Sequence, residues 1–152
     1  MEKKMTLMGA GGKILLVLLV SLALAEGFSL LYAPRFQIVD DAGPLRVLAA
    51  VMAGIGFALN LAAAFAMLCA HRRGRLATRG LYALCPNPMY AFQLLLTVPG
   101  LLLLLNSWLA LLAAVPAFVA FKAFVRDEER YLARKFGAQY AAYRKNVLLK
   151  FL

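Results

Sequence analysis

The sequence predicts an all-α polytopic membrane protein, with about four transmembrane helices followed by a C-terminal cytoplasmic amphipathic helix. Apolar residues make up 64% of its 152 residues, and the mean hydropathy is +0.78. A soluble domain is usually about 45–50% apolar, and a small one has too much surface to hide such an excess. The apolar residues also gather in runs long enough to cross a bilayer as helices. We therefore interpret residues 1–152 as a single membrane domain.

The first two predicted spans are apolar runs that cover residues 14–32 and 47–70. Each is interrupted by one polar side chain, Glu26 in the first and Asn60 in the second. An acid within a span is costly and is often functional. Glu26 is therefore expected either to reach the outer interface or to make a substrate-facing or interhelical contact. Asn60 is expected to form an interhelical hydrogen bond.

A third apolar run, residues 91–125, is too long for one span. As one helix it would measure about 50 Å at ~1.5 Å per residue, against a hydrocarbon core of about 30 Å. Its middle holds Asn-Ser-Trp at 106–108, a polar turn with an interfacial aromatic residue. The run is thus predicted to form a hairpin of two spans, residues 90–105 and 108–125. Two proline positions should kink or thin these helices: Pro99, which is followed by Gly100, and Pro116.

The positive charges predict the orientation. Of the 17 Lys and Arg residues, only Arg35 and Arg46 fall between the first two spans, and the others flank the opposite ends. The positive-inside rule then places both termini, the loop 71–89 and the tail 126–152 in the cytoplasm. The expected location is the inner membrane of a bacterium or an archaeon.

A rival interpretation concerns the N-terminus. Lys3, Lys4 and Lys13 precede a short apolar stretch that ends in Ala-Leu-Ala at 23–25, which is the pattern of a cleaved signal peptide. Cleavage there would leave three spans. The apolar sequence continues past this point to Tyr32, which favours a retained first span.

The net charge of +10 would suggest a nucleic-acid partner in a soluble protein. Here the charges flank apolar runs, so we expect them to face the anionic headgroups of the lipid bilayer, and we expect no nucleic-acid partner. The two cysteines, Cys69 and Cys85, are predicted to be cytoplasmic and reduced. The single histidine, His71, stands among arginines, and we expect no metal site.

The tail has helical periodicity from Asp127 to Val147. Three acidic residues begin it at 127–129, where they would suit the dipole of a helix start. One stripe then recurs every three or four residues: Glu129, Leu132, Phe136, Tyr140, Tyr143 and Val147. A simple surface helix needs only an apolar stripe. The stripe of the tail also holds one acid and two tyrosines, and these polar groups favour a binding role.

Two segments carry more specific patterns. Residues 80–90 read Gly-Leu-Tyr-Ala-Leu-Cys-Pro-Asn-Pro-Met-Tyr, and residues 128–147 read Glu-Glu-x-x-Leu-x-x-x-Phe-Gly-x-x-Tyr-x-x-Tyr-x-x-x-Val. This pairing resembles the isoprenylcysteine carboxyl methyltransferase and phospholipid methyltransferase superfamily of membrane proteins. One position departs from that family, because Pro86 stands where an arginine usually precedes the His/Asn-Pro pair. Ala83 also replaces a commonly basic residue, and Arg79 is a candidate substitute for the lost charge.

The resemblance implies an enzyme that uses S-adenosylmethionine as cofactor. It implies a cytoplasm-facing pocket between the Asn-Pro-x-Tyr segment, the helical hairpin and the tail. Carboxylates suit the ammonium or the ribose hydroxyls of this cofactor, and tyrosines can stack or form hydrogen bonds. No catalytic residue is assigned, because methyl transfer by direct displacement needs chiefly alignment. The cofactor-binding residues implied are Tyr82, Asn87, Pro88, Tyr90, Glu128, Glu129, Leu132 and Tyr140.

The resemblance further implies a lipid-like or lipidated methyl acceptor that enters from the bilayer. Isoprenylcysteine, phosphatidylethanolamine, a quinone-like isoprenoid and a small amphiphile all stay open, as does the oligomeric state. Two other functions stay open as well. The chain could be a non-catalytic partner or scaffold with the same fold, which Pro86 favours, or a small transporter, which Glu26 would allow.

Overall fold

The computed structural model describes residues 11–32 and 35–150, so Lys3 and Lys4 lie outside the described residues. Every regular element in this part of the chain is a helix, and a single bridge pairs Gln37 with Ser107. Three helices are long: α1 (Gly11–Tyr32), α2 (Gly43–Arg72) and α7 (Ala114–Phe136). The shorter ones are α3 (Leu81–Leu84), α4 (Pro88–Phe92), the π-helical η1 (Gln93–Thr97), α5 (Val98–Leu103), α6 (Trp108–Leu112) and α8 (Ala138–Asn146).

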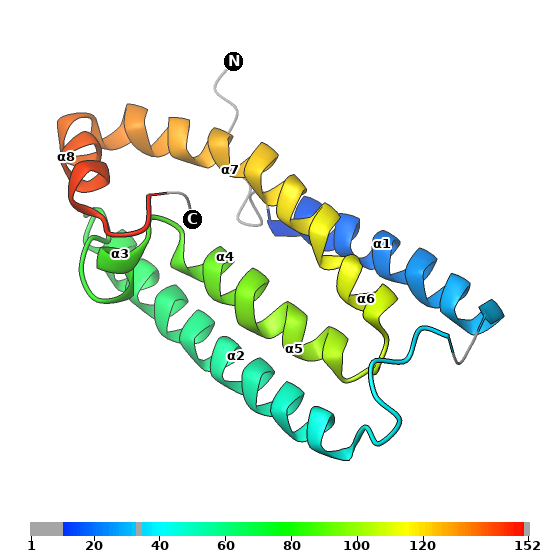
Figure 1. Ribbon diagram of the computed structural model, residues 1–152. Coiled ribbons are helices and arrows are strands. Elements are labelled where there is room, and N and C mark those ends of the chain that lie inside the picture. The colour runs from blue at the N-terminus through cyan, green and yellow to red at the C-terminus, as the bar shows by residue number, and fades with distance from the viewer. Residues whose placement is uncertain (1–10, 33–34, 151–152) are drawn as a thin grey trace.

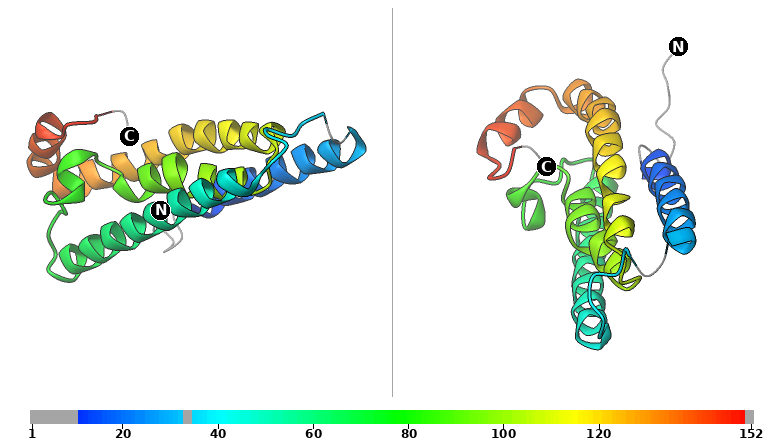
Figure 2. Two further views of the ribbon diagram at one scale, coloured as in Figure 1. Left: turned by 60° about the horizontal axis from the view of Figure 1, so that its bottom comes forward. Right: turned by 45° about the vertical axis from the view of Figure 1, so that its right-hand side comes forward.

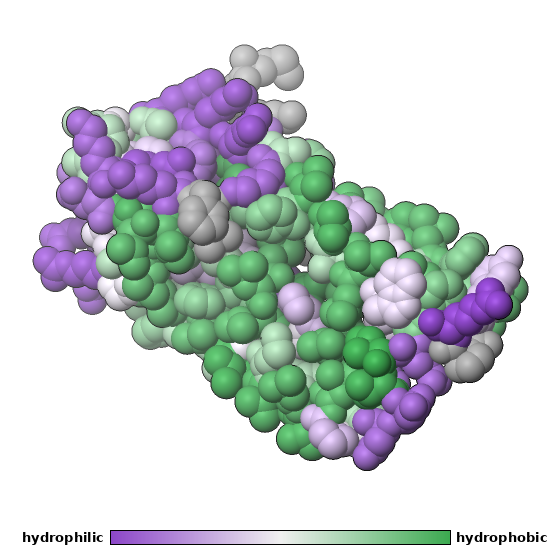
Figure 3. Space-filling view, in the orientation of Figure 1, coloured by the Kyte–Doolittle hydropathy of each residue, from purple (hydrophilic) through white to green (hydrophobic). Residues whose placement is uncertain are grey.

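The prediction of an all-α polytopic membrane protein is confirmed. Three helical stretches are long and apolar enough to cross a bilayer: α1, α2 and Trp108–Phe136, which joins α6 to α7. A shorter apolar stretch, Pro88–Leu103, lies beside them. Figure 3 shows the expected surface, with hydrophobic residues between two hydrophilic ends. The predicted spans fall on these four stretches, while their depth in the membrane stays a prediction.

The predicted hairpin turn forms between α5 and α6. Asn106 adopts a left-handed φ of 50°, which asparagine tolerates better than most residues. Its side chain donates to the Val39 carbonyl at 2.8 Å and accepts from the Val39 amide at 3.2 Å. Ser107 then caps α6, because its hydroxyl accepts from the Ala110 amide at 3.2 Å. The turn therefore fixes the loop between α1 and α2 as well as the hairpin.

Both proline positions interrupt regular helix as predicted. The π-helical turn η1 comes directly before α5, whose second residue is Pro99. A proline ring clashes with the carbonyl four residues earlier and offers no amide, so a wider turn relieves the clash. Pro116 acts similarly, since α6 ends at Leu112 and α7 begins at Ala114.

Small residues let the helices pack closely. The stretch from α4 to α5 lies along α2, while α1 lies along α7 (Figures 1 and 2). A Cβ placed on Gly100 would lie 2.6 Å from the Ala53 amide nitrogen, and one on Gly56 would lie 2.6 Å from the Thr97 nitrogen. Such contacts are typical of membrane helices, where dispersion forces replace the hydrophobic effect. The predicted thinning at Gly100 is thus a close contact between α5 and α2.

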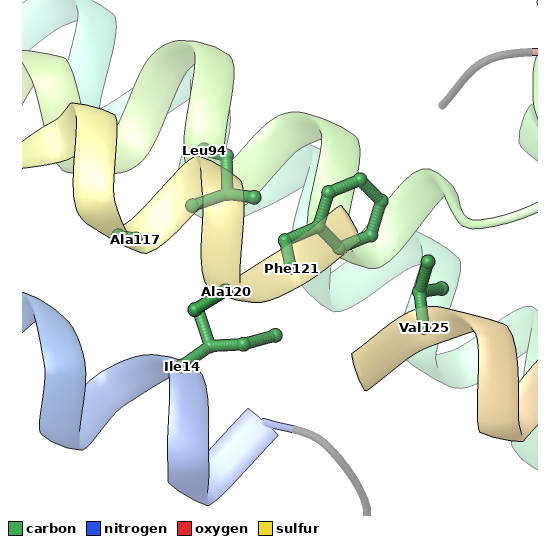
Figure 4. Close-up of a cluster of buried hydrophobic side chains, with 6 residues drawn as sticks. All are labelled: Ile14, Leu94, Ala117, Ala120, Phe121 and Val125. Carbon is green, nitrogen blue, oxygen red and sulfur yellow. The ribbon is translucent and has the colours of Figure 1, made fainter. Parts of the chain in front are cut away.

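A buried apolar cluster joins α1, η1 and α7 (Figure 4). Phe121 lies at its centre and is 1% exposed. The other members are Ile14, Leu94, Ala117, Ala120 and Val125. Many leucines and valines on the outer faces of α1, α2 and α7 are exposed instead, as lipid-facing residues should be.

Asn60 forms the predicted interhelical hydrogen bond, since its amide donates to the Met89 carbonyl at 2.8 Å. Glu26 is half-buried, and its Oε1 is enclosed by protein without a hydrogen-bond partner among the described residues. This burial argues against an exposed position for Glu26 at the outer interface, and a substrate-facing or interhelical contact stays a prediction.

The prediction of one separate tail helix from Asp127 to Val147 is wrong in detail. Residues 127–129 do not begin a helix, because they lie inside α7, which continues without a break from Ala114 to Phe136. The break comes at Gly137, whose φ is +49°, and α8 starts again at Ala138. A left-handed glycine commonly ends a helix, and here it redirects α8 across the end of the molecule (Figure 1).

Candidate functional site

The segments that the sequence singled out meet at one end of the molecule. There α3, the start of α4, the second half of α7 and α8 lie around one another, as Figure 1 shows. Backbone hydrogen bonds hold the chain after α8 against α3, from the Leu148 amide to the Ala83 carbonyl and from the Leu149 amide to the Leu84 carbonyl. These bonds are 3.4 and 2.7 Å long. Residues far apart in sequence are thereby fixed in one site.

Asn87 and Pro88 open α4 and orient one polar group toward α7. Pro88 occupies the first turn of the helix, where its missing amide costs nothing, and it is fully buried. Asn87 occupies the N-cap position, yet its side chain does not cap the helix. Its Nδ2 instead donates to Glu129 Oε1 at 3.5 Å. The asparagine amide is therefore turned toward the acidic pair of α7.

Tyr90 connects the other acid of that pair to the apolar core. Its hydroxyl donates to Glu128 Oε1 at 2.9 Å, and its ring lies 5.5 Å from the ring of Phe121. Tyr90 also lines a small crevice between α1 and the stretch from α4 to α5. The other residues of this crevice are Gly11, Ile14, Leu15, Leu18, Gln93, Leu94 and Val98. A polar site and an apolar crevice thus meet at one tyrosine.

Glu129 is the point where three elements meet. Its Oε1 accepts from Arg144 Nη1 on α8 at 2.6 Å, in addition to the bond from Asn87 at the start of α4. Arg144 was not identified from the sequence as a partner of Glu129. A signal existed, because Arg144 stands four residues after Tyr140 and so falls beside the predicted stripe.

A cluster of tyrosines lies next to the acidic pair. Tyr143 is 8% exposed, and its hydroxyl donates to the Tyr82 carbonyl at 2.7 Å and lies 3.4 Å from that of Cys85. Tyr140 is 6% exposed, and its hydroxyl has no hydrogen-bond partner within the described residues. The remaining members of the cluster are Ala63 and Val147, with Leu132 and Phe136 packed against it. The residues of the stripe that was expected on one helix therefore come from both α7 and α8, and they meet in this cluster.

Burial governs ionisation in this cluster. It raises the pKa of Tyr82, Tyr140 and Tyr143 above the usual tyrosine range. The negative charges of Glu128 and Glu129 add to the rise at Tyr82 and Tyr140 respectively, whereas Arg144 opposes it at Tyr140 and Tyr143. Cys85 is 2% exposed, and burial raises the pKa of its thiol as well, opposed by a hydrogen bond at Asn87. These groups stay neutral near pH 7, so Cys85 fills space as expected and is poorly suited to act as a nucleophile.

The eight residues implied by the resemblance all fall in this region. Four of them touch through side chains: Asn87 with Glu129, and Tyr90 with Glu128. Of the other four, Tyr82 and Tyr140 belong to the tyrosine cluster, Leu132 packs against it, and Pro88 is fully buried. Their roles in cofactor binding stay predictions. Cys69 and Cys85 are both free, and the described residues hold no cluster of His, Cys, Asp and Glu that could bind a metal ion.

Comparison with known proteins places this region within a recognised family. A family model described as phospholipid methyltransferase matches residues 45–139, which run from α2 into the start of α8. The match includes the segment 80–90 and the acidic pair of α7. Comparisons with curated proteins and with solved structures found no match.

Proposed function

The chain belongs to the phospholipid methyltransferase family, and we propose that it transfers a methyl group from S-adenosylmethionine to a membrane-embedded, lipid-like or prenylated acceptor. One observation carries the proposal. The Asn-Pro-x-Tyr segment and the Glu-Glu pair are 38 to 42 residues apart, yet Asn87 and Tyr90 each bind one of the two carboxylates. Two sequence patterns thus build a single polar site at the end of an apolar helical bundle.

The residues present fit the cofactor chemically. S-adenosylmethionine carries an ammonium group, a carboxylate, ribose hydroxyls and an adenine, and it supplies an electrophilic methyl group on its sulfonium when bound. Glu128 and Glu129 offer acceptors for the ammonium or the ribose hydroxyls. The buried hydroxyl of Tyr140, which lacks a partner in the described part of the chain, offers a further polar contact. The tyrosine cluster provides aromatic surface for the adenine.

The acceptor is proposed to approach from the lipid. The crevice between α1 and the stretch from α4 to α5 is lined mainly by apolar residues, and it ends at Tyr90, which binds Glu128. A hydrocarbon chain that lies along this apolar lining would bring the reactive headgroup to the polar end. What the protein then supplies is proximity and alignment, which suffice for a direct displacement.

The proposed orientation places this site in the cytoplasm, where the cofactor is available. The loop after α2 carries Arg72, Arg73, Arg75 and Arg79, and α7 and α8 continue the positive charge. By the positive-inside rule this end faces the cytoplasm, and both termini lie on the same side.

The test is binding of S-adenosylmethionine to the detergent-solubilised protein by calorimetry, with Glu129→Ala as the variant. We expect saturable binding, weakened about 10- to 100-fold in the variant, which is the usual effect of losing a charged hydrogen bond. Asp127→Ala is the matched control, because this substitution removes the same charge from α7, and the ion pair that Asp127 forms with Arg130 lies at the exposed surface. Its affinity should stay within about twofold.

Transfer of a labelled methyl group to vesicles identifies the acceptor class. Vesicles with phosphatidylethanolamine and vesicles with a prenylated cysteine separate the two main candidates. A folded wild-type protein without saturable binding would refute the proposed function. Equal losses in Glu129→Ala and Asp127→Ala would refute the assignment of Glu129.

A further inference from the structure

The ion pair between Glu129 and Arg144 differs from an ordinary surface pair. Its atoms lie 2.6 Å apart, and the side chains are only 24% and 33% exposed. The pair between Asp127 and Arg130 on the same helix is 3.5 Å long, and its side chains are 77% and 71% exposed. Exposed pairs contribute little, whereas withdrawing charges from water carries a desolvation cost. Because the Glu129–Arg144 pair is largely withdrawn from water, its two opposite charges interact more strongly than those of an exposed pair.

Further polar groups surround this pair. Asn87 donates to the same Glu129 oxygen that Arg144 binds. The hydroxyl of Tyr140 is buried, and no residue of the described chain binds it. The pKa of Tyr140 is raised first by burial, then by Glu129, and is lowered by Arg144, so both charges act on this hydroxyl. A buried donor without a partner is costly unless a ligand satisfies it.

From this arrangement we propose that Glu129 and Arg144 together bind the α-amino-acid end of S-adenosylmethionine, Arg144 taking the carboxylate and Glu129 the ammonium. The inference rests on the proposed function. An α-amino acid presents opposite charges close together, so it complements a pair of opposite charges. On binding, one ion pair is exchanged for two, and the α-amino-acid end adds no net charge at this pair because its ammonium and carboxylate cancel. The guanidinium of Arg144 has the planar form that binds a carboxylate through two hydrogen bonds.

Arg144 also supplies a positive charge close to Asn87. The resemblance led us to expect an arginine at the position of Pro86, with Arg79 as the candidate substitute. Arg144 and Asn87 bind the same oxygen of Glu129, so a guanidinium lies beside Asn87 even though Pro86 contributes none. The positive charge comes from α8 instead of from the loop before α4.

The experiment compares two ligands, S-adenosylmethionine and its decarboxylated form, which keeps the sulfonium and the amine but lacks the carboxylate. Calorimetry measures both affinities in wild-type protein, Arg144→Gln and Arg144→Lys. We expect wild-type protein to prefer S-adenosylmethionine, and Arg144→Gln to weaken that ligand about 10- to 100-fold while the decarboxylated ligand changes less than about twofold. Arg144→Lys keeps the charge and should keep part of the preference.

Arg130→Gln is the matched control, because it removes the same charge from an exposed ion pair on α7. It should leave both affinities unchanged. If Arg144→Gln and Arg144→Lys weaken both ligands equally, or neither ligand, Arg144 only braces α8 and the inference is overturned. Equal wild-type affinity for the two ligands overturns it too, yet leaves the proposed function standing. Should folded wild-type protein bind neither ligand, both proposals fall together. If Arg144→Gln does not fold, the affinities of wild-type protein and of Arg144→Lys for the two ligands still test the inference.

Discussion

The two ends of the molecule use polar side chains differently. At the end that holds the hairpin turn, side chains bind backbone: Asn106 both donates to and accepts from Val39, and Ser107 caps α6. At the end that holds the candidate site, the acidic pair of α7 binds other side chains: Tyr90 binds Glu128, and Asn87 and Arg144 share Glu129. The first arrangement fixes the path of the chain. The second assembles groups whose partners a ligand can replace.

This difference separates residues that hold the fold from residues that bind a ligand. A side chain that satisfies backbone groups is needed whenever the protein is folded, because those groups otherwise lose their partner. Two paired side chains can instead give up their mutual hydrogen bond and bind a ligand, while the helices stay in place. Substitutions at the hairpin end should therefore change stability, and substitutions in the side-chain pairs of the candidate site should change affinity.

The largest effect is expected from high pH, and it should fall on the site end. Burial raises the pKa of Tyr82 and Tyr143, so the folded state holds these protons more tightly than the unfolded chain. Their stabilisation is complete below the ordinary tyrosine pKa of about 10 and is lost as pH rises above it toward the raised values. Hydrogen exchange measured on both sides of pH 10 should show α8 losing protection before the hairpin turn does. Simultaneous loss at both ends would contradict this prediction.

Asn106→Ala tests the hairpin end. It removes two hydrogen bonds to Val39 and places alanine at a φ of 50°, so the free energy of unfolding should fall by about 2–3 kcal/mol. Asn106→Gly is the control, since it loses the same bonds without the backbone strain and should be about 1 kcal/mol less destabilised. Denaturant unfolding in detergent gives both values. Cofactor affinity should not change, and a large change would refute the separation of the two ends.

The smallest effects are expected from substitutions of two neighbouring tyrosines, one of which should change stability and the other affinity. Tyr143→Phe removes a buried bond to the Tyr82 carbonyl and should destabilise the protein by about 1–2 kcal/mol. Tyr140→Phe removes a hydroxyl that has no partner in the described structure, so stability should stay the same or rise slightly. Affinity for S-adenosylmethionine should fall only in Tyr140→Phe beyond the effect of unfolding. Equal destabilisation by both substitutions would show that Tyr140 has a structural role instead.

Much of the fold could be predicted because it depends on local patterns. Apolar runs of sufficient length predicted the spans, and Asn106 with Ser107 predicted the turn that divides the third run. The tail was predicted less well. Its periodicity was read as one helix, yet Gly137 divides the stripe between α7 and α8. Periodicity alone did not show this, because a break at one glycine leaves the spacing of apolar residues almost unchanged.

In the candidate site too, local patterns could be predicted from the sequence and contacts between distant residues could not. The sequence identified the Asn-Pro-x-Tyr segment and the Glu-Glu pair because each pattern is short and contiguous, and the family match includes both. The pairing of Asn87 with Glu129 and of Tyr90 with Glu128 could not be read from either pattern. Arg144 was missed as a partner of Glu129, since 15 residues and the turn at Gly137 separate the two.

Length, hydropathy and short motifs are local properties, so they were enough to predict a helical membrane protein with a phospholipid methyltransferase pattern. They could not predict which groups share an oxygen of Glu129, or which buried hydroxyl lacks a partner among the described residues. Hydrogen bonds act over only a few ångströms. Such contacts exist only once α7 and α8 have closed around the start of α4.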